Sequence, residues 1–516
     1  MTQELAADPA LGRLADAVLI PPFPGPQAPD WITEALGEGL AGVTLFGPNV
    51  RDRAQVARLT TQLRVAAAEP VIAIDEEGGD VTRISHQTGS DYPGNAALGA
   101  VDDVELTRAV YAALGAELFE LGINLNLAPT VDVNTAADNP VIGTRAFGAD
   151  TALVARHAAA AVAGLQSAGV AACAKHFPGH GSTRLDSHHV IATVQGSLRE
   201  LHERDLPPFE AAIKAGVRAI MPSHLLVPEL TGELPASLSS AALTDLLRGE
   251  LGFTGLIVSD GLEMRAVSEP YGIPEAAVLA VMAGTDLLCL GRDIDQLTFL
   301  AVRTALIDAV RSGRLPGERL EDAAARVAEL RAWTAGAVRD RGPAAGWLAN
   351  AGASRPALVS SSVEAAGSQV GLAAARRAVL VIGGSPEPLT NPLEVQLVAP
   401  SNMAAGAVPW GVGPWLPPGS TREVSTDTPA DQLDSVADEL LAEAADRSLI
   451  IEVRDAHRYP AATGLVTRLL AARPDAVVVE MGLPVWRPPA DHYLASYGAA
   501  RSNATAVAEI LGLADQ

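Results

Sequence analysis

Short apolar runs alternate with long helical patterns between residues 16 and 339, and this alternation restricts the possible folds more than any other feature of the chain. The apolar runs predict buried strands, and the segments between them carry apolar residues at the three- and four-residue spacing of amphipathic helices. The expected strands are residues 17–20, 42–46, 71–74, 124–127, 171–174, 219–221, 256–258 and 287–290. Eight strands with intervening helices predict an α/β fold whose N-terminal part is a (β/α)8 TIM-like barrel, with its active site at the carboxyl ends of the strands.

A second, smaller unit is expected after the barrel. Residues 342–362 are rich in Gly, Ala, Pro and Ser, a composition typical of a linker. Further strands are expected at 378–382, 449–453 and 476–480, with helices at 430–445 and 461–472. The predicted organisation is a catalytic barrel domain over 1–340, a linker over 341–372 and a C-terminal α/β sandwich domain over 373–516.

Composition and charge narrow the class of protein. The net charge of −24, from 37 basic and 61 acidic residues, disfavours nucleic acid or an anionic membrane as a partner. The two cysteines, Cys173 and Cys289, lie in apolar runs and are expected to be buried, reduced thiols. The first twenty residues carry acids instead of a basic signal-peptide segment, and no apolar run is long enough for a membrane span, so a cytoplasmic location is expected.

Residues 174–190 (AKHFPGHGSTRLDSHHV) follow a predicted strand and hold four of the ten histidines. Asp186 and His188 stand two positions apart, so that the carboxylate can orient the imidazole, which then titrates near neutral pH. This pair is a candidate acid/base dyad, and the alternative is a hydrogen-bonded loop histidine. A metal-dependent amidohydrolase is a weaker hypothesis, because Pro178 and Gly179 interrupt regular ligand spacing. Its candidate ligands are His176, His180, Asp186, His188 and His189.

Asp260 directly follows the predicted strand 256–258. At the mouth of a barrel its carboxylate is a candidate nucleophile toward an anomeric carbon, and the alternative is an N-cap of the following helix. Glu263 competes for this role but is expected on the helix surface. The segment VIAIDEEGGDVTRI at 71–84 offers Asp75 and Arg83 for hydrogen bonds with sugar hydroxyls, whereas Glu76 and Glu77 could equally be solvated.

Together these segments resemble glycoside hydrolase family 3, in its β-N-acetylglucosaminidase branch. The most specific motifs are KHFPGHG at 175–181 and DSH at 186–188. The resemblance implies that Asp260, in the S-D-x-L-x-M element, is the nucleophile and that His188 with Asp186 transfers the proton. It also implies substrate binding by Asp75, Arg83, Arg145, Lys175 and His176, without a cofactor. Asp80 departs from the motif, which often has a basic residue there.

The activity implied is that of a retaining β-N-acetylhexosaminidase, which removes terminal β-linked N-acetylglucosamine from short oligosaccharides or muropeptides by double displacement. A histidine acid/base leaves less negative charge near an anionic acceptor, so a β-N-acetylglucosaminide phosphorylase is an alternative. A sugar-binding protein without turnover is a third hypothesis, against which Asp260 and the dyad argue. The dyad would make a catalytic contribution from the C-terminal domain unnecessary, and Asp455, His457 and Arg458 are expected in a solvated loop.

Overall fold

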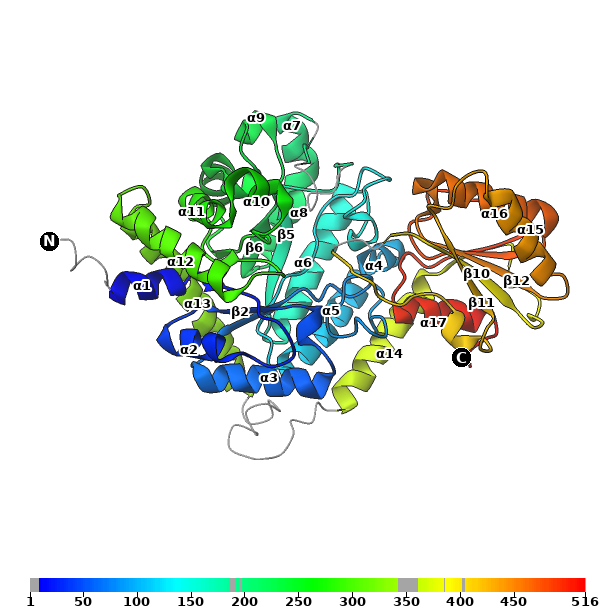
Figure 1. Ribbon diagram of the computed structural model, residues 1–516, viewed down its shortest axis with the longest axis horizontal. Helices are drawn as coiled ribbons and strands as arrows, with labels where there is room; N and C mark the ends of the chain where they lie inside the picture. Colours follow the sequence, from blue (N-terminus) through cyan, green and yellow to red (C-terminus); the bar gives the residue numbers. More distant parts are fainter. Residues whose placement is uncertain are drawn as a thin grey trace.

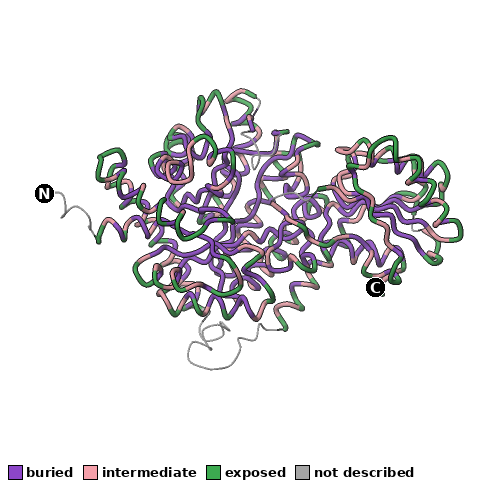
Figure 2. The backbone as a smooth tube through the Cα atoms, in the orientation of Figure 1, coloured by how far each residue is buried: buried purple, intermediate pink, exposed green. Residues whose placement is uncertain are grey.

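Two bodies lie side by side in the computed structural model: a barrel ringed by helices and a second sheet with helices on both faces (Figure 1). The structure describes residues 9–184, 192–194, 196–341, 361–384, 386–400 and 404–515. Figure 2 shows that the buried segments concentrate in the strands of both bodies, whereas the outer helices and loops alternate between buried and exposed. Among the helices of these ranges, none combines the length and apolar composition that crossing a membrane requires.

The eight strands expected from the sequence are all present, in the expected order, and form a parallel barrel. They are β1 Leu19–Ile20, β2 Gly42–Leu45, β3 Val71–Ile74, β4 Leu125–Asn126, β5 Ala171–Phe177, β6 Ala219–Pro222, β7 Leu256–Ile257 and β8 Leu288–Cys289. Strands β2 to β7 pair in chain order, and β8 pairs with β1. A parallel bridge between Val258 and Leu287 joins β7 to β8, and the Thr44 N–H donates to the Pro21 carbonyl (3.3 Å) beside β1 and β2.

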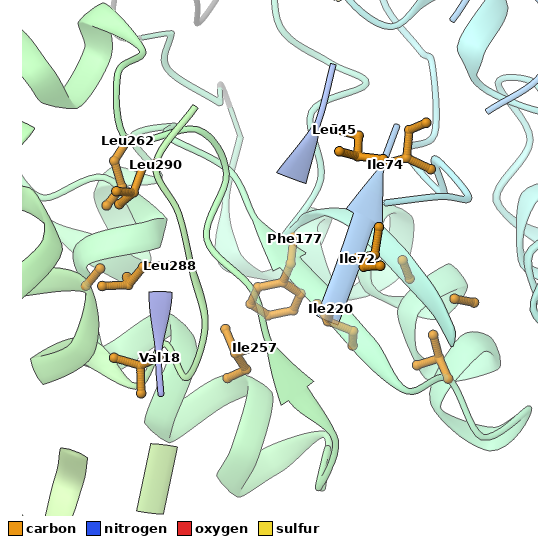
Figure 3. Close-up of a cluster of buried hydrophobic side chains, with 14 of the residues drawn as sticks. Val18, Leu45, Ile72, Ile74, Phe177, Ile220, Ile257, Leu262, Leu288 and Leu290 are labelled. Atoms are coloured by element: carbon orange, nitrogen blue, oxygen red, sulfur yellow. The ribbon is translucent and has the colours of Figure 1, made fainter. Parts of the chain in front are cut away.

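Successive side chains of each strand point alternately into and out of the barrel, which divides the core into two layers. Val71 and Ala73 belong to the cluster inside the barrel, which takes residues from every strand except β2, whereas Ile72 and Ile74 pack outward against the helices. Successive side chains of a strand point to opposite faces, so both faces must be apolar when both are covered. Figure 3 shows members of the outer layer, including Ile72, Ile74, Ile220 and Ile257.

Helices cover the outside of the barrel, and several begin where an aspartate caps them. The side chains of Asp52, Asp103, Asp150 and Asp295 accept backbone N–H groups from the first turns of α3, α5, α6 and α12. The helices of this domain are α1 Pro9–Asp16, α2 Asp30–Glu38, η2 Gly47–Asn49, α3 Arg53–Ala66, α4 Asn95–Val101, α5 Val104–Glu120, η3 Gly143–Arg145, α6 Thr151–Ser167, α7 Leu198–Glu200, η4 Leu201–Asp205, α8 Leu206–Lys214, α9 Pro228–Thr231, η5 Ala236–Leu238, η6 Ala241–Glu250, α10 Arg265–Tyr271, α11 Ile273–Ala283, α12 Gln296–Arg311 and α13 Gly317–Arg341.

The second domain is a sheet in the order β11-β10-β12-β13-β14-β9, parallel except for β9 at one edge. Its strands are β9 Leu380–Ile382, β10 Leu393–Val398, β11 Thr421–Ser425, β12 Leu449–Val453, β13 Val477–Glu480 and β14 His492–Ala495. Its helices are α14 Ser361–Ala378, η9 Gly413–Trp415, α15 Leu433–Glu443, η10 Ala456–Arg458, α16 Pro460–Ala472 and α17 Arg501–Ile510. Helices α15 and α16 cover one face of the sheet and α17 the other, as an α/β sandwich requires.

Helix α14 lies where the two domains meet. It begins at Ser361, within the stretch 341–372 that the sequence interpretation assigned to a linker, and it packs against α4 and α5 of the barrel and α17 of the second domain. Gly371 lies directly against the backbone of Asp91, which leaves no room for a side chain there. Arg377 adds an ion pair to Asp103 (2.8 Å). The helix therefore joins the second domain to one side of the barrel, and the predicted domain limits stay a prediction.

Candidate active site

A cavity of about 580 Å³ opens at the carboxyl ends of the barrel strands. The loops after β2, β3, β4, β5, β7 and β8 line it, with residues 404–408 of the second domain. Six of the residues that the sequence predicted for the site face this one cavity: Asp75, Arg83, Arg145, Lys175, His176 and Asp260. Their convergence follows from the fold, because the carboxyl ends of all strands of a parallel barrel meet at the same face.

A charged network occupies one side of the cavity. The Lys175 ammonium group lies 2.7 Å from Asp75 Oδ1 and 2.8 Å from Glu77 Oε1. Arg145 donates to both carboxylate oxygens of Glu77, through Nε at 2.9 Å and Nη2 at 2.7 Å. The paired charges and the bidentate geometry hold the four side chains in one arrangement.

Glu77 is the centre of this network, and its position corrects the expectation that it could be solvated. Both Glu77 and Glu76 are buried, with 4% and 3% of their surface exposed. Burial alone would raise the pKa of Glu77, but the positive charges of Arg145 and Lys175 outweigh it and hold that pKa well below its usual range. Glu77 is therefore ionised, and it fixes the two cations that face the cavity.

His176 is held in one tautomer by its two neighbours. Its Nδ1 lies 2.8 Å from Asp132 Oδ2, and its Nε2 lies 3.3 Å from Arg145 Nη2. Because a guanidinium group can only donate, the imidazole Nε2 accepts and the proton is on Nδ1, where it is donated to Asp132. Both ring nitrogens of His176 are therefore engaged by protein groups at the edge of the cavity.

Asp132 also orders the end of β5 and the loop that follows it. Its Oδ1 accepts the backbone N–H groups of His176 (3.2 Å) and His180 (2.7 Å). His180 is buried, its Nδ1 lies 2.7 Å from Thr183 Oγ1, and burial lowers its pKa to about 4. A buried aspartate beside two histidines was not singled out from the sequence, because nothing local in VDVN indicates that its carboxylate turns toward a different loop.

Asp260 follows β7 and lines the same cavity as the charged network. Its Oδ1 accepts the N–H of Gly261 at 2.8 Å, and the Gly261 carbonyl accepts from Nε2 of the buried His224 at 3.0 Å. The next helix, α10, begins at Arg265 with Met264 at its N-cap position, so Asp260 does not cap it. The carboxylate is half-buried and directed to the cavity, which is the environment that a nucleophile needs.

Glu263 lines the same cavity, which corrects its expected place on a helix surface. The chain is still irregular at this position, since α10 begins two residues later. Glu263 Oε1 accepts the N–H of Arg292 at 2.8 Å, and its carboxylate lies over Gly291, where a Cβ atom would collide with it. Glu263 and Asp260 are therefore two carboxylates on one loop of the site.

The second domain forms part of the cavity wall. Residues 404–408 line it, and the Ala404 carbonyl accepts from Arg83 Nη2 at 2.8 Å. The same guanidinium group lies 3.9 Å from Asp75 Oδ2. The loop after β12, expected to be solvated, touches the barrel as well: His457 Nε2 donates to the Ala137 carbonyl at 2.8 Å. A sequence pattern in one domain does not reveal such contacts.

The predicted dyad, Asp186 and His188, lies in residues 185–191, outside the described residues. The chain before this stretch is fixed at Thr183 by His180, and the chain after it is fixed where Leu226 N–H donates to the Ala192 carbonyl at 3.0 Å. The acid/base role of the pair stays a prediction. Within the described ranges, no group of three or more His, Cys, Asp or Glu side chains is arranged to hold a metal ion.

Some known proteins resemble this chain over part of its length, and others over nearly all of it. The family described as "Glycosyl hydrolase family 3 N terminal domain" matches residues 27–330. "Beta-hexosaminidase A" of Pseudoalteromonas piscicida is 36% identical over 318 residues, which cover 57% of this chain and 53% of that protein, so the chain spans about half of that relative's length. "Beta-hexosaminidase" of Stenotrophomonas maltophilia strain K279a is 38% identical over 279 residues, 52% of this chain and 81% of that protein.

The solved structure of a glycoside hydrolase family 3 β-N-acetylglucosaminidase from Paenibacillus sp. strain FPU-7 superposes with a TM-score of 0.83 and 32% identity. The match covers 98% of this chain and 97% of that one, so it includes both domains. The barrel and the second α/β domain therefore belong to one known architecture. The chain belongs to glycoside hydrolase family 3.

Proposed function

We propose that this protein is a retaining β-N-acetylhexosaminidase that removes terminal β-linked N-acetylglucosamine from short oligosaccharides or muropeptides. One observation carries the proposal: Asp260 shares a single cavity with a buried array of hydrogen-bonding groups from Asp75, Arg145, Lys175 and His176. A carboxylate nucleophile facing such an array suits attack on the anomeric carbon of a bound sugar. The names of the relatives and of the Paenibacillus structure support the choice of sugar.

Binding of the terminal sugar follows from the donors and acceptors on the cavity wall. The Asp75 carboxylate is an acceptor for hydroxyl protons, and Lys175 and Arg145 are donors to hydroxyl or carbonyl oxygens. Each charge already has a partner in the protein, so the array does not need to rearrange when a neutral sugar displaces water. The array thus holds the anomeric carbon in one place relative to Asp260.

The chemistry proceeds in two displacements. Asp260 attacks the anomeric carbon and forms a glycosyl–enzyme bond, while the glycosidic oxygen takes a proton and leaves with its sugar. A water molecule then gives up a proton and attacks the same carbon, which releases the sugar with its β configuration retained. We assign both proton transfers to His188, oriented by Asp186, on the basis of the family resemblance.

Rates on two aryl glycosides test the substrate. The p-nitrophenyl β-N-acetylglucosaminide should be cleaved with a kcat/KM far above that of the β-glucoside, because the proposed site gains contacts with the acetamido group that the β-glucoside lacks. Equal or reversed values would refute the proposed sugar. Product analysis with a GlcNAc disaccharide in phosphate buffer separates the two acceptors: free N-acetylglucosamine is expected, and its 1-phosphate would show the phosphorylase instead.

The cellular setting is a separate proposal. We propose that the enzyme is cytoplasmic and acts on small carbohydrates, in keeping with its strongly acidic composition and its low aromatic content of 4%, which disfavours long stacking platforms for polymers. Cell fractionation of the producing organism tests the location. A kcat/KM that rises steadily with the length of chitin oligosaccharides would contradict the preference for short substrates.

A further inference from the structure

Asp80 lies between Asp75 and Arg83 on the loop after β3, and its carboxylate joins three segments that are far apart in the sequence. Its side chain is 4% exposed. Oδ2 accepts from Thr144 Oγ1 at 2.5 Å and lies 2.8 Å from Arg454 Nη2. Oδ1 accepts the backbone N–H of Ala499 at 3.0 Å. All of its contacts therefore face protein, and they engage both oxygens.

These partners connect the site to the second domain. Thr144 is the neighbour of Arg145 in η3, so Asp80 ties the loop that carries Asp75 to the loop that carries Arg145. Arg454 follows β12 and Ala499 precedes α17, so the other two contacts come from the second domain. One carboxylate thus sets the distance between two barrel loops and the position of both relative to that domain.

Arg454 is itself held in a defined place. The next residue, Asp455, has φ of +52°, its N–H donates to Glu480 Oε1 at 2.8 Å, and its Oδ1 accepts the Leu483 N–H at 2.9 Å. Burial alone would lower the pKa of Arg454, but Asp80 and Asp455 outweigh it and raise that pKa. The guanidinium group therefore remains charged and is presented to Asp80 from an ordered turn.

We infer that Asp80 and Arg454 are positioning residues that form an interdomain latch, through which docking of the second domain sets the affinity of the barrel for its sugar. This inference rests on the proposed function. The latch acts through the loops of Asp75 and Arg145, and its geometry is reinforced on the cavity side by the bond from Arg83 to the Ala404 carbonyl. Neither latch residue lines the cavity of the site, so its loss moves the binding array while Asp260, on a different loop, stays in place.

The test is a double-mutant cycle with Asp80→Asn, Arg454→Gln and the double variant, assayed on p-nitrophenyl β-N-acetylglucosaminide. Displacement of the two loops is expected to raise KM by roughly 10- to 100-fold in each single variant, with kcat within a few-fold of wild type. The double variant should be no worse than the poorer single variant, because both remove the same contact. Arg454→Lys, which keeps the charge with less directional donors, should fall between wild type and Arg454→Gln.

Arg377→Gln is the matched control, since it removes the Arg377–Asp103 ion pair (2.8 Å) between α14 and the barrel without touching the binding loops. Its KM should equal that of wild type. Thermal unfolding shows which variants are folded; if Asp80→Asn fails to fold, Arg454→Gln and Arg454→Lys complete the test. If the folded latch variants keep the wild-type activity and KM, the latch inference is wrong while the proposed function stands. The same holds if Arg377→Gln raises KM as much as the latch variants do. A wild type that cleaves no β-N-acetylglucosaminide overturns the proposed function instead.

Discussion

Glu76 and Glu77 are adjacent and buried, but replacing each by glutamine should change the stability of the protein in a different way. Glu77→Gln removes a carboxylate that takes two N–H groups of Arg145 and the ammonium group of Lys175. Glu76→Gln removes a carboxylate that accepts the backbone N–H groups of Arg83 (2.8 Å) and Ile84 (2.9 Å) and bonds the Thr82 side chain, without a cation among these partners. The two residues have similar burial, so the comparison isolates the effect of the buried cations.

The expected magnitudes follow from the contacts and the pKa shifts. Glu77→Gln leaves buried cations short of one negative charge and turns an amide N–H toward a donor, which should lower the free energy of unfolding by about 3 to 5 kcal/mol. Burial raises the pKa of Glu76 from 4.5 to about 7. A raised folded pKa stabilises the fold below pH 4.5, and this contribution is lost as pH rises through 7. As pH rises from 5 to 8, the free energy of unfolding of the wild type should fall by about 2 to 3 kcal/mol relative to that of Glu76→Gln.

Urea unfolding of the three proteins at several pH values between 5 and 8 measures both effects. Glu77 has a lowered pKa, so its contribution is present throughout this range and would be lost only in stronger acid. The gap between wild type and Glu77→Gln should therefore stay constant with pH, whereas the gap between wild type and Glu76→Gln should change. Equal, pH-independent effects of the two substitutions would refute the assignment of Glu77 as the ionised centre of the network.

Gly291→Ala, with Gly25→Ala as its control, probes the packing of Glu263, and His188→Ala probes the predicted acid/base. Gly291→Ala, at φ of +99°, should destabilise the protein and lower kcat/KM because its Cβ collides with the Glu263 carboxylate, whereas Gly25→Ala, at φ of +80° with open space around it, shares only the backbone strain. Thermal unfolding and activity of the two variants measure the difference, and equal losses would contradict the packing of Glu263. His188→Ala should slow a GlcNAc disaccharide far more than the p-nitrophenyl glycoside, whose leaving group needs little protonation. Equal slowing of the two substrates would argue against a general acid at His188.

The barrel could be predicted because each of its strands leaves a recognisable pattern in a short stretch of sequence. Each strand such as β3 is buried on both faces, so it appears in the sequence as a short apolar run between amphipathic helices. The strands missed in the second domain break that pattern. β10 (LEVQLV) buries the polar Glu394 and Gln396 among apolar residues, and β11 (TREVS) is an edge strand whose residues are only partly covered. Neither strand therefore has the continuous apolar sequence that predicts a buried strand.

The site was predictable only in part, for the same reason. Asp75 and Asp260 follow strand ends, Lys175 lies in the last part of β5, and the barrel brings all strand ends together. The roles of Asp132 and of residues 404–408 depend on packing between loops and between domains, which no local spacing encodes. Glu263 was placed wrongly because the helix was assumed to start at Asp260, whereas the chain remains irregular up to Arg265.

Covalent labelling tests the central claim most directly. A fluorinated β-N-acetylglucosaminide with a good leaving group should accumulate the glycosyl–enzyme, because fluorine slows both displacements whereas the good leaving group restores the rate of the first only. Peptide mass spectrometry should then find one sugar on Asp260 and none in the Asp260→Asn variant. A label on Glu263 instead, or turnover of the probe without any covalent adduct, would contradict the account.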